Sequence, residues 1–245
     1  MTSSVADVDA NAAHGNAGTR ARRVAKLKRR SRSAISRVLR NRPIQLRSRS
    51  LRSRDYLDIG CGSNVHSSFI NLNYQWLRGV NLCWDLVQGL PLPDESVRGV
   101  FSEHCIEHLP LDAGDHVLEE CYRVLKPGGT LRIVVPDGEL YLTAYARNVA
   151  GDEVRLPFSE GDRYESIYTP IMSVNRIFGN FGHRFIYDYA TLRELLGRHG
   201  FVDIERAAFR AGRDPVLLID TEKRAPESLY VEATKPANPS AVPAG

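Results

Sequence analysis

A glycine-rich turn follows the first short apolar run of the chain. Residues 56–59 read Tyr-Leu-Asp-Ile and lead directly into Gly60, Cys61 and Gly62. Glycine has no Cβ, so the backbone can turn sharply here and a ligand can approach it closely. The carboxylate of Asp58 can accept a hydrogen bond from an amino group or from backbone amides. The turn predicts a ligand site, with a purely structural strand-to-helix junction as the alternative.

The same turn disfavours a dinucleotide. The dinucleotide-binding fingerprint needs a third glycine at position 65, where this chain has Val65. An NAD-dependent oxidoreductase is therefore a weaker hypothesis than an enzyme with another nucleotide-like cofactor.

Histidines supply the second candidate chemistry. His104, Glu107 and His108 are spaced as HxxEH, the inverted zinc-peptidase motif, in which two imidazoles share a helix face and bind zinc. Leu109-Pro110 leaves little room for that helix, so we predict no metal. His104 is expected as an active-site wall or a catalytic group, and His108 as a hydrogen-bonded loop residue. His183 is the other candidate base, with loop packing as its alternative.

An α/β sheet is needed to bring these groups together. Two helices are expected, one capped by Asp112 and ended by residues 127–129, and one capped by Thr191 and ended at Gly200. Apolar runs predict strands at 56–59, 69–72, 80–84, 99–102, 130–135, 201–207 and 229–233. We predict a Rossmann-like, doubly wound α/β fold: a mostly parallel seven-stranded sheet with an antiparallel last strand and helices on both faces. Ligands then bind at the carboxyl ends of the strands, beside the first strand.

Four motifs in order resemble the class I S-adenosylmethionine-dependent methyltransferases, most closely their small bacterial type 11 branch. They are YLDIGCG at 56–62, DL…LPLPD at 85–94, FSEH…EHL at 101–109 and ECYRVLKPGG at 120–129. The resemblance covers roughly 55–235 and implies S-adenosylmethionine as the cofactor.

The resemblance also implies roles for individual residues. Asp58 and the turn of Gly60, Cys61 and Gly62 would hold the methionine part of the cofactor. Asp85 would face the adenine amino group, with Leu86 packed on the ring. The sulfonium and the acceptor pocket would lie beside Ser102, Glu103 and His104. Asn73 stands where the family usually has an acid for the ribose hydroxyls, and its amide can bond a hydroxyl only without charge assistance.

The predicted reaction is methyl transfer to a hydroxyl of a small molecule or glycan, with His104 or His183 as the base. Residues 136–190 are expected to form an acceptor cap whose aromatic residues suit a saccharide or phenol: Tyr141, Tyr145, Tyr164, Tyr168 and Tyr187. The alternatives are a methyltransferase-like binding module without turnover and a nucleic-acid methyltransferase. The latter is disfavoured because the acidic body would repel a nucleic-acid duplex, and because Ser102-Glu-His104 stands where an Asn/Asp-Pro-Pro-Tyr signature would follow the fourth strand.

Charge divides the 245-residue chain, whose net charge is +4. Residues 20–54 hold 15 of the 33 Lys and Arg residues and no acid. We predict a flexible basic arm at 1–54, partly helical within 20–42, a methyltransferase domain at 55–235 and a disordered tail at 236–245. The arm is a candidate tether to anionic membrane lipid or polymer.

The remaining composition indicates a cytoplasmic enzyme. There is no signal-peptide core and no apolar run of about 18 residues. The four cysteines are isolated rather than paired in CxxC motifs, as free thiols in a reducing compartment are.

Overall fold

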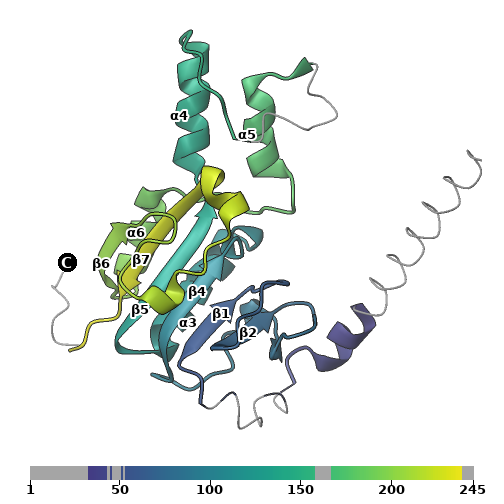
Figure 1. Cartoon of the computed structure of the whole chain (residues 1–245), viewed down its shortest axis with the longest axis vertical. Helices are drawn as coiled ribbons and strands as arrows, with labels where there is room; N and C mark the ends of the chain where they lie inside the picture. The colour runs from purple at the N-terminus through teal and green to yellow at the C-terminus, as the bar shows by residue number, and fades with distance from the viewer. Residues whose placement is uncertain (1–32, 43–44, 46–50, 52, 158–166, 239–245) are drawn as a thin grey trace, which may run out of the picture.

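The computed structural model describes residues 33–42, 45, 51, 53–157 and 167–238 (Figure 1). Within these residues seven strands form one sheet in the order β3-β2-β1-β4-β5-β7-β6. The pairs among β1 to β5 are parallel, whereas β7 is antiparallel to both of its neighbours, β5 and β6. The strands are β1 (Tyr56–Ile59), β2 (Phe69–Asn73), β3 (Leu82–Cys83), β4 (Val97–Glu103), β5 (Leu125–Pro136), β6 (Val202–Arg206) and β7 (Ser228–Thr234). This order confirms the predicted fold class.

Two amphipathic helices cover one face of the sheet. They are α3 (Leu111–Val124) and α6 (Tyr189–Arg198), whose apolar stripes include Leu118 and Leu196. Both side chains are buried in one core cluster with Leu57 and Ile59 of β1. The central strands are apolar on both sides, as buried parallel strands are.

The opposite face departs from the prediction of helices on both sides. Phe101 and Tyr230 pack there against Leu217 of the short 3₁₀ helix η5 (Pro215–Leu217). The cover within the described residues is thus the β6–β7 connection, which Figure 1 draws in yellow-green across the sheet. Buried Arg132 of β5 anchors this connection by ion pairs to Asp220, at 2.5 Å, and to Glu232 of β7, at 2.7 Å.

Several predicted element boundaries are wrong. Pro110, not Asp112, precedes α3, and Leu111 is its first residue. The helix ends at Val124, before the Pro-Gly-Gly motif, because Leu125 already pairs with Val97 of β4. Asp188, not Thr191, caps α6, and its carboxylate accepts a hydrogen bond from the Thr191 amide at 2.8 Å.

Two helices project together beyond the sheet. They are α4 (Gly138–Val149), which follows the carboxyl end of β5, and α5 (Pro170–Gly179), which lies beside it (Figure 1). Tyr141 of α4 and Ile177 of α5 are buried in a core cluster of their own. This unit occupies the region expected to form the acceptor cap, although Tyr164 lies outside the described residues.

Part of the predicted basic arm packs against the edge strand β3. Residues 33–39 are helical, while 20–32 of the predicted helix lie outside the described residues. The amide of Asn41 donates to Cys83 O at 3.1 Å, and its side-chain oxygen accepts from the Asp85 amide at 2.9 Å. Gln45 Oε1 accepts from the Cys83 amide at 2.7 Å. A domain boundary at residue 54 stays a prediction, as does a disordered tail at 236–245. No helix in the described part is long and apolar enough to cross a membrane.

Candidate active site

A cavity of about 260 Å³ lies at the carboxyl ends of β1 and β4. Strand order reverses at β1, since β2 flanks it on one side and β4 on the other, and open α/β sheets bind ligands at this switch point. The lining combines six residues predicted from the sequence with seven others: Asp58, Gly60, Cys61, Gly62, Glu103 and His104, then Ser63, Asn64, His66, Phe101, Ile219, Lys223 and Arg224.

The glycine turn has the backbone that the sequence predicts. Gly60 has φ 78° and Gly62 has φ 55°, both in the left-handed region that favours glycine. The amides of Gly60 and Cys61 donate to Leu72 O of β2 at 2.9 and 3.1 Å. A Cβ on Gly60 would lie 2.4 Å from Cys105 Sγ, so no larger residue fits without movement.

Two carboxylates face the cavity from neighbouring strands. Asp58 of β1 is only 3% exposed, and burial together with the charge of Glu103 raises the pKa of its carboxyl well above the ordinary value. Glu103 ends β4, and its carboxylate accepts a hydrogen bond from the Thr221 amide at 2.7 Å. Two such acids are best stabilised by a cationic group between or beside them.

The opposite wall comes from the β6–β7 connection. Lys223 and Arg224 belong to the 3₁₀ helix η6 (Glu222–Glu227), and Asn64 of the glycine turn donates to Thr221 Oγ1 at 3.2 Å just before it. The sequence prediction missed these residues. They carry no local motif, and they reach the cavity only because the ion pair of Arg132 with Asp220 holds the connection over the sheet.

His104 is a buried, uncharged wall residue. It follows β4 with φ 48°, and burial lowers the pKa of its imidazole to about 2. Its Nε2 lies 2.9 Å from Ser228 Oγ, and that hydroxyl donates to Arg224 O. The ring therefore donates from Nε2 and leaves Nδ1 without a proton. Such a weakly basic ring is a poor proton acceptor near neutral pH.

Comparisons with known proteins agree with this geometry. A family model for the methyltransferase domain matches residues 75–133. A probable S-adenosylmethionine-dependent methyltransferase of Mycolicibacterium smegmatis (strain ATCC 700084 / mc(2)155) is 29% identical over 178 residues, covering 66% of each chain. The chain is thus similar in sequence to S-adenosylmethionine-dependent methyltransferases, and it spans about two thirds of the length of the relative that it matches. The family match covers β3, β4 and α3, and the cavity lies where β1 and β4 end.

Solved methyltransferase structures are also similar to the chain. One from Thermotoga maritima is 20% identical, with 74% of this chain and 81% of that chain covered and a TM-score of 0.47. Another from Archaeoglobus fulgidus is 20% identical, with 78% and 93% covered and a TM-score of 0.46.

Four of the predicted cofactor residues do not line the cavity. The Asn73 side chain donates to Gln75 O at 2.7 Å, and Asp85 caps the 3₁₀ helix η2 (Leu86–Gln88). Leu86 is buried in the main core, and the buried hydroxyl of Ser102 has no hydrogen-bond partner among the described residues. These residues follow or end β2, β3 and β4, so they share an edge of the sheet with the cavity. Their contacts with a cofactor stay predictions.

The second predicted base, His183, also lies outside the cavity lining. Its Nδ1 is 2.6 Å from Ile177 O of α5, and its ring lies 5.0 Å from the ring of His108. His108 ends the 3₁₀ helix η3 (Ile106–His108), so the sequence was right that no long helix follows His104.

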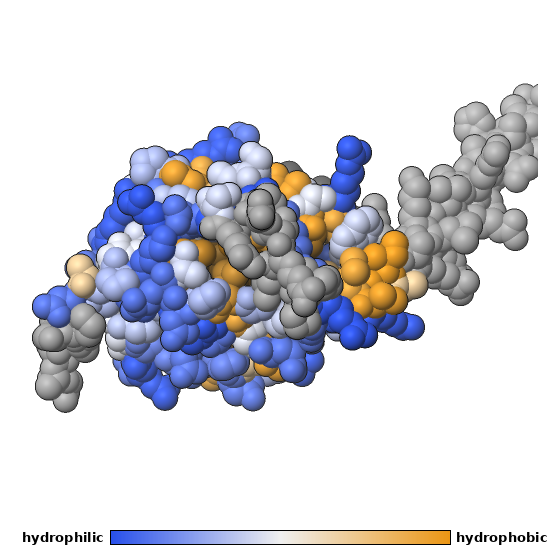
Figure 2. Space-filling model, turned by 90° about the horizontal axis from the view of Figure 1, so that it is seen from below, coloured by the Kyte–Doolittle hydropathy of each residue, from blue (hydrophilic) through white to orange (hydrophobic). Residues whose placement is uncertain are grey.

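A larger cavity lies at the other end of the sheet. It measures about 670 Å³ and is lined mostly by apolar residues, among them Leu51, Ile70 and Leu92. Figure 2 views the molecule from below, where hydrophobic residues reach the surface among hydrophilic ones. The lining includes Val97, the first residue of β4. The amino ends of parallel strands are not where this fold binds ligands, so the smaller cavity is the candidate active site.

Proposed function

We propose that this protein transfers a methyl group from S-adenosylmethionine to a hydroxyl of a small molecule or glycan. The observation that carries the proposal is the pair of cavity-facing carboxylates, Asp58 and Glu103, beside a glycine turn at the switch point of the sheet. S-adenosylmethionine supplies an electrophilic methyl group on a sulfonium, so the protein's task is alignment and exclusion of water.

The cavity is large enough for the methionine part of this cofactor but not for the whole molecule. Ligand sites for small molecules span about 300–1,000 Å³, whereas this cavity measures about 260 Å³. Asp58 would accept hydrogen bonds from the ammonium group of the methionine part. The positive charge of that group complements the negative charge of the buried carboxylate. The ribose and adenine would lie over the ends of β2 and β3, beside Asn73 and Asp85.

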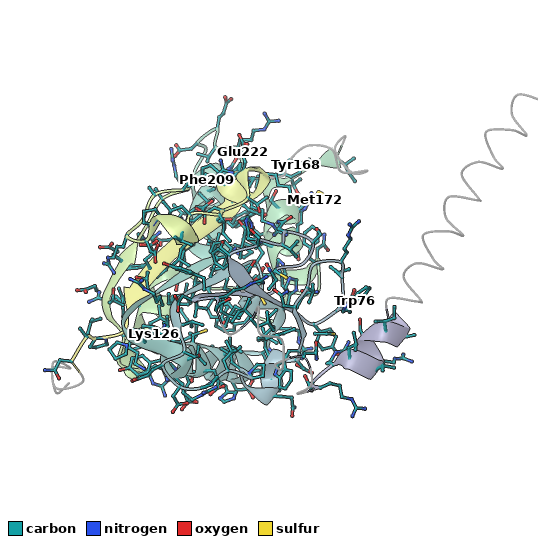
Figure 3. All side chains as sticks on the ribbon, turned by 60° about the horizontal axis from the view of Figure 1, so that its bottom comes forward. Trp76, Lys126, Tyr168, Met172, Phe209 and Glu222 are labelled. Atoms are coloured by element: carbon teal, nitrogen blue, oxygen red, sulfur yellow. The ribbon has the colours of Figure 1, made fainter. Side chains whose placement is uncertain are left out.

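The acceptor would enter from the side of α4 and α5. Tyr168 and Met172, which label this unit in Figure 3, lie at the same end of the molecule as Glu222 of η6, whereas Lys126 lies at the far end. In the reaction the acceptor oxygen forms a bond to the methyl carbon, the carbon–sulfur bond breaks, and the hydroxyl proton passes to a base. The low pKa of His104 disfavours it as that base and leaves His183 as the better of the two predicted candidates.

Binding calorimetry with the full chain tests the cofactor. We expect Asp58→Asn, which keeps the side chain's size but loses its charge, to weaken S-adenosylmethionine binding by about tenfold or more, as loss of a charge-assisted hydrogen bond does. Asp55→Asn is the matched control, because Asp55 precedes the other end of β1 and pairs with Lys126 at the surface. Equal affinity in Asp58→Asn and the unaltered chain would contradict the proposal.

A second candidate function is cofactor binding without turnover. Asn73 at the ribose position and the uncharged His104 both favour it. A screen of sugars, phenols and other alcohols with a mass readout separates the two, since a binding module takes up the cofactor but methylates none of them.

A further inference from the structure

Three side chains of types that can bind a metal ion converge from two segments that are distant in the sequence. Glu107 and His108 belong to η3, and His183 lies between α5 and α6. One ligand atom of each lies within 4.8 Å of the others. The backbone holds the segments together, because the amides of Arg184 and Phe185 both donate to Glu107 O, at 2.7 and 3.2 Å.

The carboxylate of Glu107 is buried without a hydrogen-bond partner. Its side chain is 0% exposed, and neither Oε1 nor Oε2 accepts a hydrogen bond within the described part of the chain. The nearest ring nitrogens are His104 Nδ1, at 3.5 Å, and His108 Nε2, at 3.8 Å from Oε1. These distances are too long for good hydrogen bonds. An unsatisfied buried acceptor is costly, and more so when it is charged.

The protons of the surrounding imidazoles are already used elsewhere. His104 donates from Nε2 to Ser228, so its Nδ1 faces Glu107 as a lone pair. His183 donates from Nδ1 to Ile177 O, which leaves Nε2 as a lone pair. The His108 ring donates to the backbone of Gly182, which leaves its other nitrogen bare. The three imidazoles thus turn lone pairs rather than N–H groups toward Glu107, an arrangement that a cation satisfies.

We propose that Glu107, His108 and His183 bind a divalent transition-metal ion, with Zn²⁺ as the occupant. Two imidazoles and one carboxylate, with a fourth position open, are the donor set of catalytic zinc sites. The hydrogen bond from His183 Nδ1 to a carbonyl is the outer-shell contact that orients a metal-binding imidazole. Tetrahedral zinc ligands lie about 3.4 Å apart for bonds of about 2.1 Å, and the side chain of His108, 40% exposed, has room to close the remaining gap.

This site differs from the zinc motif that the sequence shows. In that motif His104 and His108 would be the two imidazole ligands, whereas here His183 takes the place of His104. The proposed site therefore differs from the prediction of no metal, and it includes a residue that lies far along the chain.

The metal site adjoins the candidate active site through His104. That ring lines the cavity and also lies 3.5 Å from Glu107. A zinc ion would occupy the free Nε2 of His183, so His183 would then act as a ligand rather than as the base. Because a zinc ion lowers the pKa of a bound hydroxyl or water, the ion itself would activate a hydroxyl acceptor. This last consequence rests on the proposed function, but the metal site itself does not.

Zinc titration of the full chain tests the proposal. Chelator-treated protein is titrated with Zn²⁺ against a chromophoric competitor, and Co²⁺ loading is followed by its visible absorption. We expect one ion per chain, and binding weakened by at least about tenfold in Glu107→Gln and in His183→Ala, because loss of even an outer-shell partner costs 10–100-fold. His116→Ala is the matched control, since its exposed imidazole lies 3.2 Å from Glu119 on α3.

Two results would overturn the proposal. One is the absence of stoichiometric Zn²⁺ binding by the unaltered chain, together with an infrared band of a protonated carboxylic acid that Glu107→Gln removes. The other is unchanged affinity in His183→Ala. Circular dichroism verifies that each variant folds. The titration needs no S-adenosylmethionine, so its failure is separate from a failure of the proposed function.

Discussion

Glycine at position 60 is required by both its backbone and its surroundings. Its φ of 78° favours glycine, and the space where a Cβ would stand is taken by Cys105 Sγ at 2.4 Å. Gly128 has nearly the same backbone, with φ 77°, but no atom of the residues that the structure describes lies within 4 Å of its Cβ position. Replacing Gly128 by alanine therefore costs only the strained backbone, whereas replacing Gly60 costs the strained backbone and the overlap with Cys105.

We expect Gly60→Ala to lower the free energy of unfolding more than Gly128→Ala does. The left-handed backbone costs alanine about 1 kcal/mol at either position, and the overlap with Cys105 adds about 1–3 kcal/mol at position 60. Urea denaturation of the two variants measures the difference. Equal losses would mean that Cys105 moves aside freely and that its contact adds nothing to the need for glycine at position 60.

At the scale of elements, α3 holds the loop that enters β4. Glu120 accepts a hydrogen bond from the Leu90 amide at 2.6 Å and pairs with Arg123 at 2.7 Å. Arg123 in turn donates to Leu90 O and Leu92 O. The hydrogen bond from Arg123 lowers the pKa of the Glu120 carboxyl below its ordinary value of 4.5. This one carboxylate therefore links helix and loop.

We expect Glu120→Gln to lower the free energy of unfolding at neutral pH by about 1.5–3 kcal/mol, the worth of hydrogen bonds to a charged group. The pKa of Glu120 is lower in the folded than in the unfolded state. The excess free energy of unfolding of the unaltered chain over the variant is therefore fully present above pH 4.5, and it is lost as the pH falls through the folded-state pKa. Urea denaturation across this range measures it. Glu119→Gln, on the exposed face of α3, is the control and should change little. A pH-independent difference would contradict the ionic origin.

At the scale of the whole molecule, the basic N-terminal segment is not uniform. Asn41 and Gln45 hydrogen-bond to Cys83 and Asp85 at the edge of the sheet, and Leu51 is buried in the main core. Asp85 is also the predicted adenine contact. The segment from about residue 36 onward thus supports the side of the sheet where the nucleoside would lie.

We expect removal of residues 1–32 to leave S-adenosylmethionine binding unchanged, and removal of residues 1–50 to weaken it and to lower the free energy of unfolding by a few kcal/mol. The longer deletion removes several backbone-directed hydrogen bonds, each worth about 0.5–1.5 kcal/mol. Calorimetry and urea denaturation of both truncated chains measure this. Identical behaviour of the two would show that the packing of Asn41 and Gln45 contributes nothing to the fold or the site.

The sequence by itself determined the sheet and the first half of the site. Apolar runs and glycine turns act locally, so strands β1, β2, β4 and β5 and the turn at Gly60 could be placed from residue type and order alone. The motif order then located Asp58 and Glu103, which the structure brings to one cavity.

Only the tertiary structure decided which distant residues complete the site. Arg224 reaches the cavity because buried Arg132 anchors the β6–β7 connection, and His183 meets Glu107 because backbone hydrogen bonds join segments more than 70 residues apart. Helix starts at Leu111 and Tyr189 also differed from prediction, since competing caps lie within a few residues of each other. Such contacts depend on the free energy of the whole fold, and no spacing along the chain encodes them.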